Sequence, residues 1–134
     1  ERPDHFEVAL NLAVTLTEDN SDDSISAALS PVKAMLGFYI GGMGAKGQNY
    51  HTKLMARMGF EAEAHQIQDL FLEGRRDEAI ATVPDRFADE ISLVGTPERI
   101  RDRLQAFEES PVTMLNVAPR SNDHLRQVAE LIQV

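Results

Sequence analysis

The sequence predicts an α/β fold with a parallel sheet, and three observations lead to this prediction. Residues 6–17 alternate between large apolar side chains and small or polar ones, as a strand does. Residues 91–134 follow the order strand, helix, strand, helix with short connections, which is typical of βα units. Residues 21–90 hold apolar side chains at helical spacing. With 134 residues and 43% hydrophobic content, the chain is long enough for one domain with a buried core.

The first strand, predicted over Phe6–Thr17, has two different faces. Leu10, Leu12 and Val14 share one face with other large residues, whereas residues such as Asn11 alternate with them on the other. A small, partly polar face suits the crowded interior of a barrel, with the large residues turned out toward helices. An antiparallel sheet with one solvated face explains this strand equally well.

Residues 18–90 predict a turn and then a series of helices. The oxygen-bearing side chains of residues 18–24 are expected to form a solvated turn and a helix N-cap, because the run lacks the Gly and Glu of a calcium-binding EF-hand loop. Ser30 and Pro31 match an N-cap and a first helical position, so we expect two helices with a break between them. Gly59 and Gly74 are expected to end later helices.

The last part of the chain predicts two βα units. Strands are expected at Ile91–Val94 and Val112–Ala118, and Thr96 and Pro97 match the N-cap and first position of the helix between them. Three parallel strands alone would leave their edges unpaired and the small face of the first strand uncovered. The chain also begins with Glu1. We therefore expect a fragment of a larger domain.

Composition narrows the possible partners. A formal net charge of −9 disfavours nucleic acid and anionic membranes, which would repel the chain. The sequence contains no cysteine and no apolar run of membrane-spanning length. These features predict a soluble, cytoplasmic protein.

The glycine-rich segment at residues 41–50 matches G-x-G-x-x-G between Gly42 and Gly47. A dinucleotide-binding fingerprint must follow a strand and open a helix, but here a helical pattern precedes the glycines. A Walker A loop is excluded by order, because Lys46 comes before the last glycine. The histidines, at positions 5, 51, 65 and 124, lack zinc-ligand spacing, so no metal site is expected.

Several segments together resemble the luciferase-like monooxygenase superfamily, and specifically its F420-dependent oxidoreductases. The resemblance begins with YIGGMGAKGQNY at residues 39–50 and continues through RMGFE at 57–61 and IQDLFLEGR at 67–75. It extends through ATVP at 81–84, LVGTPERI at 93–100 and TMLNVAP at 113–119, which is similar to the last barrel strand of the family. It therefore covers nearly the whole chain, in order.

The resemblance implies that residues 1–134 are the C-terminal part of a single (β/α)8 TIM barrel. The three strands would be the sixth, seventh and eighth of the barrel. Residues 1–20 would form a strand and turn, residues 21–90 an enlarged helical insertion, and residues 91–134 two βα units. The first five strands, which supply most of the cofactor cradle in the family, would lie outside this chain.

The resemblance also implies a cofactor, coenzyme F420 or alternatively FMN, bound at the carboxyl ends of the strands. Catalytic residues remain unassigned, and helix capping explains Thr96 as well as ligand binding does. Lys46 stands where relatives have Arg, which keeps the charge but loses the planar fork. The residues expected to contact cofactor or substrate, most of them in a flexible lid, are Gly41, Gly42, Met43, Gly44, Lys46, Asn49 and Thr96.

The implied function is that of an oxidoreductase that transfers hydride between a deazaflavin or flavin and an organic small molecule. Whether this chain alone is an enzyme stays open. A second hypothesis is a non-catalytic half-barrel, or a helical interaction module, that only associates with itself or with a partner chain. An exposed, unpaired strand edge would favour such association, so we expect a homo-oligomer or pairing with the missing half of the barrel.

Overall fold

The computed structural model describes residues 6–132, so His5 lies outside the described part of the chain. These residues form strands and helices that divide into two compact units. The sheet unit contains the described residues up to Ala28 and those from Ile91 onward, and the helical unit contains Leu29–Glu90. Each unit is described by itself below.

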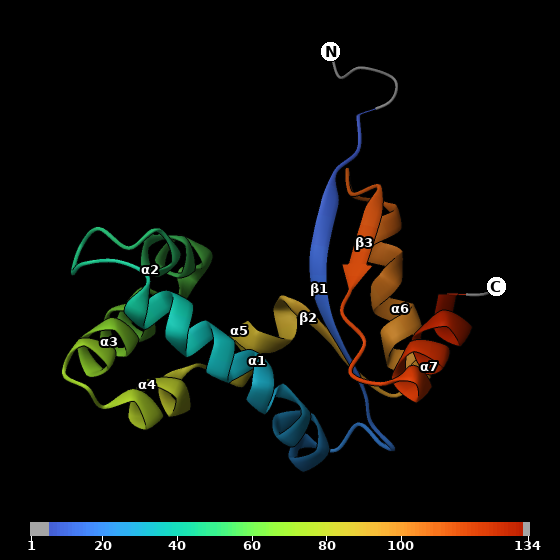
Figure 1. Ribbon diagram of the computed structural model, residues 1–134, viewed down its shortest axis with the longest axis horizontal. Coiled ribbons are helices and arrows are strands. Elements are labelled where there is room, and N and C mark those ends of the chain that lie inside the picture. Colours follow the sequence, from blue (N-terminus) through green and yellow to red (C-terminus); the bar gives the residue numbers. More distant parts are fainter. Residues whose placement is uncertain (1–5, 133–134) are drawn as a thin grey trace. The chain divides into compact units, whose positions relative to one another are not determined.

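The sheet unit contains three parallel strands, β1 (Ala9–Leu16), β2 (Ser92–Gly95) and β3 (Met114–Val117), as Figure 1 shows. The parallel sheet predicted from the sequence is confirmed. The alternation of residues 6–17 overestimated the first strand at both ends, because its ladder stops where β2 and β3 stop. Ala13–Leu16 pair with β2, and Ala9–Leu12 pair with β3.

The strands lie in the order β2-β1-β3. In a barrel of consecutive βα units, each strand lies beside the next one in the chain, so the second strand would separate the first from the third. Here β1 is the central strand, because it is long enough to pair with a different short strand along each half. The numbering of these strands as the sixth to eighth of a barrel therefore stays a prediction.

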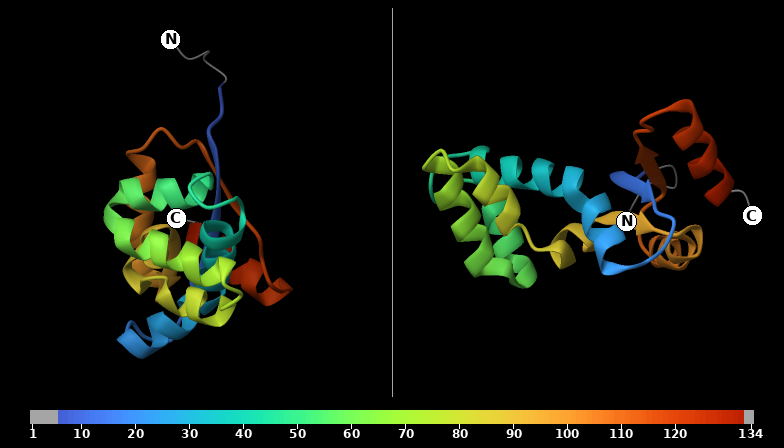
Figure 2. Two further views of the ribbon diagram at one scale, coloured as in Figure 1. Left: turned by 90° about the vertical axis from the view of Figure 1, so that its left-hand side faces the viewer. Right: turned by 90° about the horizontal axis from the view of Figure 1, so that it is seen from below.

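One face of the sheet carries the core of this unit. Leu12 and Val14 of β1 and Leu93 of β2 pack with side chains of α6 (Pro97–Glu108) and α7 (Asn122–Ile132), which are visible beside β3 in Figures 1 and 2. The predicted orientation of β1, with its large residues toward helices, is confirmed. The helical side chains of this core are Ile100, Leu104, Phe107, Val128 and Leu131.

The helix α1 (Asp22–Gly42) begins in the sheet unit and continues into the helical unit. It runs through Pro31 without interruption, so the predicted break at Ser30 and Pro31 is wrong. Proline removes one helical hydrogen bond, but the helix retains buried apolar residues before and after it, Leu29 and Val32, whose packing favours a continuous helix.

In the helical unit, the shorter helices lie around the second half of α1 (Figures 1 and 2). They are α2 (Tyr50–Met55), a π-helical turn η1 (Ala56–Phe60), α3 (Glu61–Leu72), α4 (Arg76–Thr82) and α5 (Asp85–Glu90). The predicted interruptions at Gly59 and Gly74 are confirmed by positive φ angles of 94° and 83°. The segment after Pro84 forms the short helix α5.

Candidate functional site

The glycine-rich segment of the helical unit connects α1 to α2. Gly41 and Gly42 are the last residues of α1, and the ring of Phe71 from α3 packs directly against them. A Cβ atom on Gly41 would lie 2.4 Å from the Cβ atom of Phe71. These two glycines therefore provide close helix packing, and a role for them in cofactor binding stays a prediction.

Asn49 closes this connection as the N-cap of α2 and is almost fully buried. Its side-chain oxygen accepts hydrogen bonds from the backbone N–H groups of His51 and Thr52, at 2.8 and 3.4 Å. Its amide nitrogen donates to the carbonyl oxygens of Tyr39 and Ile40, at 2.9 and 2.8 Å. Asn49 thus joins the end of α1 to the start of α2, a role that local sequence patterns did not reveal.

The tip of the connection is a tight turn. Gln48 donates its backbone N–H to the carbonyl oxygen of Ala45 at 2.9 Å, and Gly47 adopts a φ of 75° at the third position, where glycine is favoured. Lys46 occupies the second position of this turn, and its ammonium group lies 2.6 Å from a carboxylate oxygen of Asp69. Both side chains are well exposed, so the ion pair is weak.

A cavity of about 360 Å³ lies beside this turn. Of the predicted site residues, Lys46 and Asn49 line it, whereas Met43 is an exposed apolar residue outside its lining. Lys53, His65 and Gln68 have no signal in the sequence that would link them to this cavity, because they come from helices that meet only in the folded chain. The residues that line the cavity are Lys46, Gly47, Asn49, Thr52, Lys53, His65, Gln68 and Asp69.

Thr96 belongs to the sheet unit and caps α6, as the sequence predicted. Its hydroxyl oxygen accepts from the backbone N–H of Arg99 at 3.4 Å and from the side-chain amide of Asn20 at 3.1 Å. Its own N–H donates to the side-chain oxygen of Asn20 at 3.0 Å. The hydroxyl of Thr96 is therefore engaged in holding the residues after β1 against the start of α6.

The first turn of α6 also carries an anion of its own. The carboxylate of Glu98 accepts a hydrogen bond from its own backbone N–H and interacts with the side chain of Thr96, and these interactions lower the pKa of Glu98. The acidic residue stabilises the positive end of the helix dipole. A ligand phosphate at this helix end would have to displace Glu98.

Polar side chains also lie on the sheet face opposite the core. Asn116 of β3 donates to Asn11 of β1 at 3.3 Å, and Arg120, just beyond β3, donates to the hydroxyl of Thr15 at 3.1 Å. His124 accepts the backbone N–H of Arg120 on Nδ1 at 3.0 Å, while its buried Nε2 has no hydrogen-bond partner. The arrangement places a guanidinium group at the carboxyl end of the sheet, where it could bind an anionic ligand group.

The turn after β1 is held by Asp19, whose carboxylate accepts from the hydroxyl of Ser21 at 2.6 Å and from its backbone N–H at 2.9 Å. These hydrogen bonds, together with one from Ser24, lower the pKa of Asp19 to about 2. Ser21 in turn accepts from the backbone N–H of Ser24 at 3.3 Å, so the predicted turn and N-cap are confirmed.

Among residues 6–132, no cluster of His, Asp and Glu side chains has the arrangement of a metal site. In the same part of the chain, none of the helices combines the length and apolar character needed to cross a membrane. The three described histidines, at positions 51, 65 and 124, lie in helices and are exposed or half-buried.

Comparison with known proteins identifies the relatives of this fold. The sequence model of the family described as luciferase-like monooxygenase matches residues 1–114. A protein of Mycobacterium tuberculosis (strain ATCC 25618 / H37Rv) named "Putative coenzyme F420-dependent oxidoreductase" is 33% identical over 127 residues, which cover 95% of this chain and 35% of that protein. The chain thus spans about a third of the length of this relative. The family match covers most of the sequence, and the chain belongs to the luciferase-like monooxygenase family.

Proposed function

We propose that this chain is the C-terminal part of an oxidoreductase that transfers hydride between coenzyme F420, or alternatively FMN, and an organic small molecule. The observation that carries the proposal is the 33% identity over 95% of the chain to a protein whose name includes F420-dependent oxidoreductase. The parallel sheet and its carboxyl-end polar groups are compatible with a barrel enzyme, whose active site lies at that end of the strands.

The residues of this chain fit the anionic parts of such a cofactor. Arg120 at the carboxyl end of the sheet and Lys46 in the glycine-rich turn each present a cation on their own unit. When bound, the deazaflavin or flavin ring supplies the hydride chemistry. The contribution of the protein is to orient the ring and the substrate and to provide electrostatic complementarity.

Within this proposal, Met43, Gly44 and Lys46 belong to a lid that contacts cofactor or substrate. Asn49 and the two glycines at the end of α1 support the lid through the packing described above. Thr96 contributes on the sheet unit, either through α6 or by a direct contact that replaces Asn20.

Cofactor binding tests the proposal. F420 and FMN are titrated separately into the chain and into a full-length protein that contains it, and their fluorescence is followed. We expect the full-length protein to bind one of them, and Lys46→Gln to weaken that binding. Failure of the full-length protein to bind either cofactor would contradict the proposal. If variants of Lys46 and of Asn49 both kept their cofactor affinity and turnover, the proposed role of the lid would be contradicted.

A second candidate function is association without catalysis, and a specific surface favours it. Met35, Phe38 and Tyr39 are exposed and follow helical spacing along the end of α1, and the exposed Met43 comes directly after the helix, so these residues form an apolar stripe. Such a stripe suits self-association or contact with another part of a barrel. Sedimentation analysis of the chain over a range of concentrations tests this hypothesis, and a monomer that binds cofactor would contradict it.

A further inference from the structure

The cavity beside the glycine-rich turn has an unusual charge for this protein. The whole chain has a formal net charge of −9. The lining of the cavity contains two lysines, Lys46 and Lys53, and a single carboxylate, that of Asp69. Its formal charge is therefore positive, and an anion that the rest of the surface repels would be attracted here.

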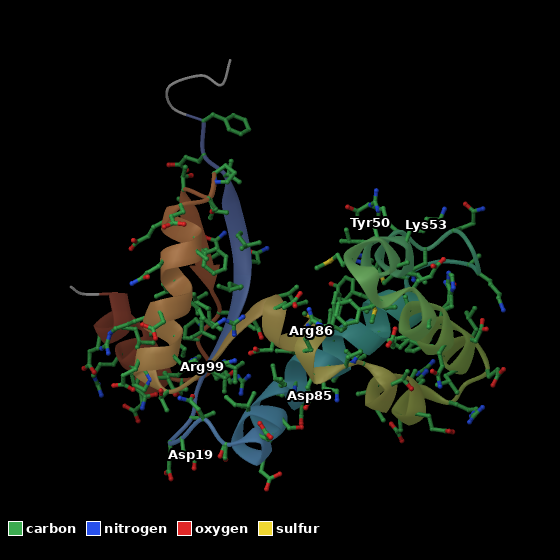
Figure 3. The ribbon with its side chains drawn as sticks, turned by 180° about the vertical axis from the view of Figure 1, so that it is seen from behind. Asp19, Tyr50, Lys53, Asp85, Arg86 and Arg99 are labelled. Carbon is green, nitrogen blue, oxygen red and sulfur yellow. The ribbon has the colours of Figure 1, made fainter. Side chains whose placement is uncertain are left out.

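Two of the basic side chains are available for a ligand. Within the part of the chain that the structure describes, the side chains of Lys53 and His65 form no ion pair or hydrogen bond with the protein. Lys46 is engaged with Asp69, but this exposed pair is easily exchanged for a stronger partner. Figure 3 shows Lys53 on the short helix α2, together with Tyr50.

The positions of these side chains follow from the local structure. His65, Gln68 and Asp69 are spaced by three and four residues on α3, so they share one face of that helix. Lys53 comes from α2, and the turn centred on Lys46 and Gly47 completes the lining. Gln68 is almost fully buried, and its amide donates a long hydrogen bond of 3.5 Å to the carbonyl of Ala45. A ligand oxygen could compete for this weakly held donor.

The chemistry of the donors favours phosphate over carboxylate. The ammonium groups of the lysines are compact point charges and the imidazole ring of His65 is a separate polar group, so they approach an anion from different directions, which suits a tetrahedral phosphate group. No arginine, whose planar fork matches both carboxylate and phosphate, is among the lining residues of this cavity, so an anion here would be held by point charges, as lysine holds phosphate. A volume of about 360 Å³ is at the lower end of the range for small-molecule sites.

We propose that this cavity binds the phosphate group of a small molecule, held by Lys53 and His65, with Lys46 leaving Asp69 to join them. The site shares Lys46 with the lid of the proposed redox function but does not depend on that function, because phosphate can bind whether or not the chain holds a redox cofactor. Gln68 then donates the hydrogen bond that fixes one phosphate oxygen.

The test is a titration of the chain with inorganic phosphate, followed by the NMR chemical shifts of backbone amides at constant pH and ionic strength. We expect saturable shifts in residues 45–53 and 65–69. Lys53→Gln should weaken binding about three- to fivefold, since a partly exposed ionic contact contributes up to about 1 kcal/mol. Asp69→Asn should strengthen binding, because it removes a negative charge and releases Lys46.

Arg57→Gln is the matched control, since Arg57 is exposed, lies one helical turn beyond Lys53 and is outside the cavity lining. It removes the same charge and should leave phosphate affinity unchanged. Equal weakening by the Lys53 and Arg57 variants would mean that phosphate responds only to net charge, and would overturn the proposal. Absence of saturable shifts, or equal affinity for glutarate, would also overturn it.

Two phosphorylated sources are then separated. If FMN shifts the same amides and riboflavin does not, the phosphate belongs to the cofactor. If glycerol 3-phosphate shifts them and FMN does not, it belongs to a substrate. Either result supports the phosphate site. Binding of FMN and riboflavin with equal affinity, but without shifts at these amides, would support the redox function while contradicting the site.

Discussion

The two units of this chain differ in how completely they enclose their cores. In the helical unit, helices surround residues such as Leu29, Met55 and Ile67, which have no exposed surface. In the sheet unit, α6 and α7 contribute the helical core residues on one face, while Asn11 and Asn116 remain exposed on the opposite face of β1 and β3. The helical unit therefore builds its core from its own residues on all sides, whereas the sheet unit retains an open face.

The largest effects are expected from core truncation, which tests this difference directly. Ile67→Ala should lower the free energy of unfolding by about 4 kcal/mol, because the fully enclosed cavity cannot collapse. Leu93→Ala should cost less, about 2–3 kcal/mol, because the one-sided sheet core can relax around the gap. Urea unfolding measures both values, and native-state hydrogen exchange shows which unit loses protection. Equal costs would remove the distinction between the units.

Close packing in the helical unit is tested next by Gly41→Ala. Helix propensity alone would stabilise α1 by about 1 kcal/mol. The contact with Phe71 should reverse the sign and destabilise the unit by about 1–3 kcal/mol, since the backbone must shift to admit the methyl group. Ala34→Gly, at an exposed position of the same helix, is the control: thermal unfolding of this variant measures the stability difference that comes from helix propensity alone. A stabilising Gly41→Ala would show that the helices are not held at this spacing.

In the sheet unit, the helix cap at Thr96 should contribute less to the free energy of unfolding than these core contacts. Thr96→Ala is expected to lower the unfolding free energy by about 1 kcal/mol, through loss of the α6 cap and of the contact with Asn20. Thr96→Ser keeps the hydroxyl and should remain close to wild type in denaturant titration. If cofactor affinity falls in both variants while stability is kept in the serine variant, Thr96 makes a direct ligand contact.

The smallest effect is expected from Asp19 in the turn after β1, and it depends on pH. The pKa of Asp19 is lowered from 3.8 to about 2 in the folded chain, so its contribution to stability is complete above pH 3.8 and is lost as the pH falls through about 2. Asp19→Asn should remove this part of the acid sensitivity and leave the rest. Urea unfolding curves at several pH values between about 2 and 3.8 measure the contribution of Asp19 to stability. Identical pH profiles for both proteins would exclude the hydrogen-bonded turn as its source.

Local patterns predicted those parts of the fold that depend on neighbouring residues. The two faces of β1, the positive φ of Gly59 and Gly74 and the cap at Thr96 follow from alternation, backbone freedom and capping chemistry. At Pro31 the local pattern predicts a break, because proline is unfavourable inside a helix in general, but buried residues on either side maintain a continuous helix here.

The remaining features depend on contacts between distant residues. The order of the strands is set by which short strand pairs with each half of β1, and no local signal encodes that choice. Lys53 and His65 belong to different helices, so their shared cavity appears only once α2 and α3 are folded together. The glycine-rich motif is similar to a nucleotide-binding loop, yet two of its glycines, Gly41 and Gly42, are explained by the ring of Phe71 packed against them.

The four hydrogen bonds of Asn49 allow few other side chains at this position. An aspartate has almost the same shape and would still receive the two N–H groups of α2, but it would direct a negative charge at the carbonyls of Tyr39 and Ile40. A leucine of similar size would remove all four of these hydrogen bonds, although the carbonyl of Ile40 would keep another partner, the hydroxyl of Thr52. Replacing a single nitrogen atom with oxygen would therefore turn attraction into repulsion at the junction of two helices.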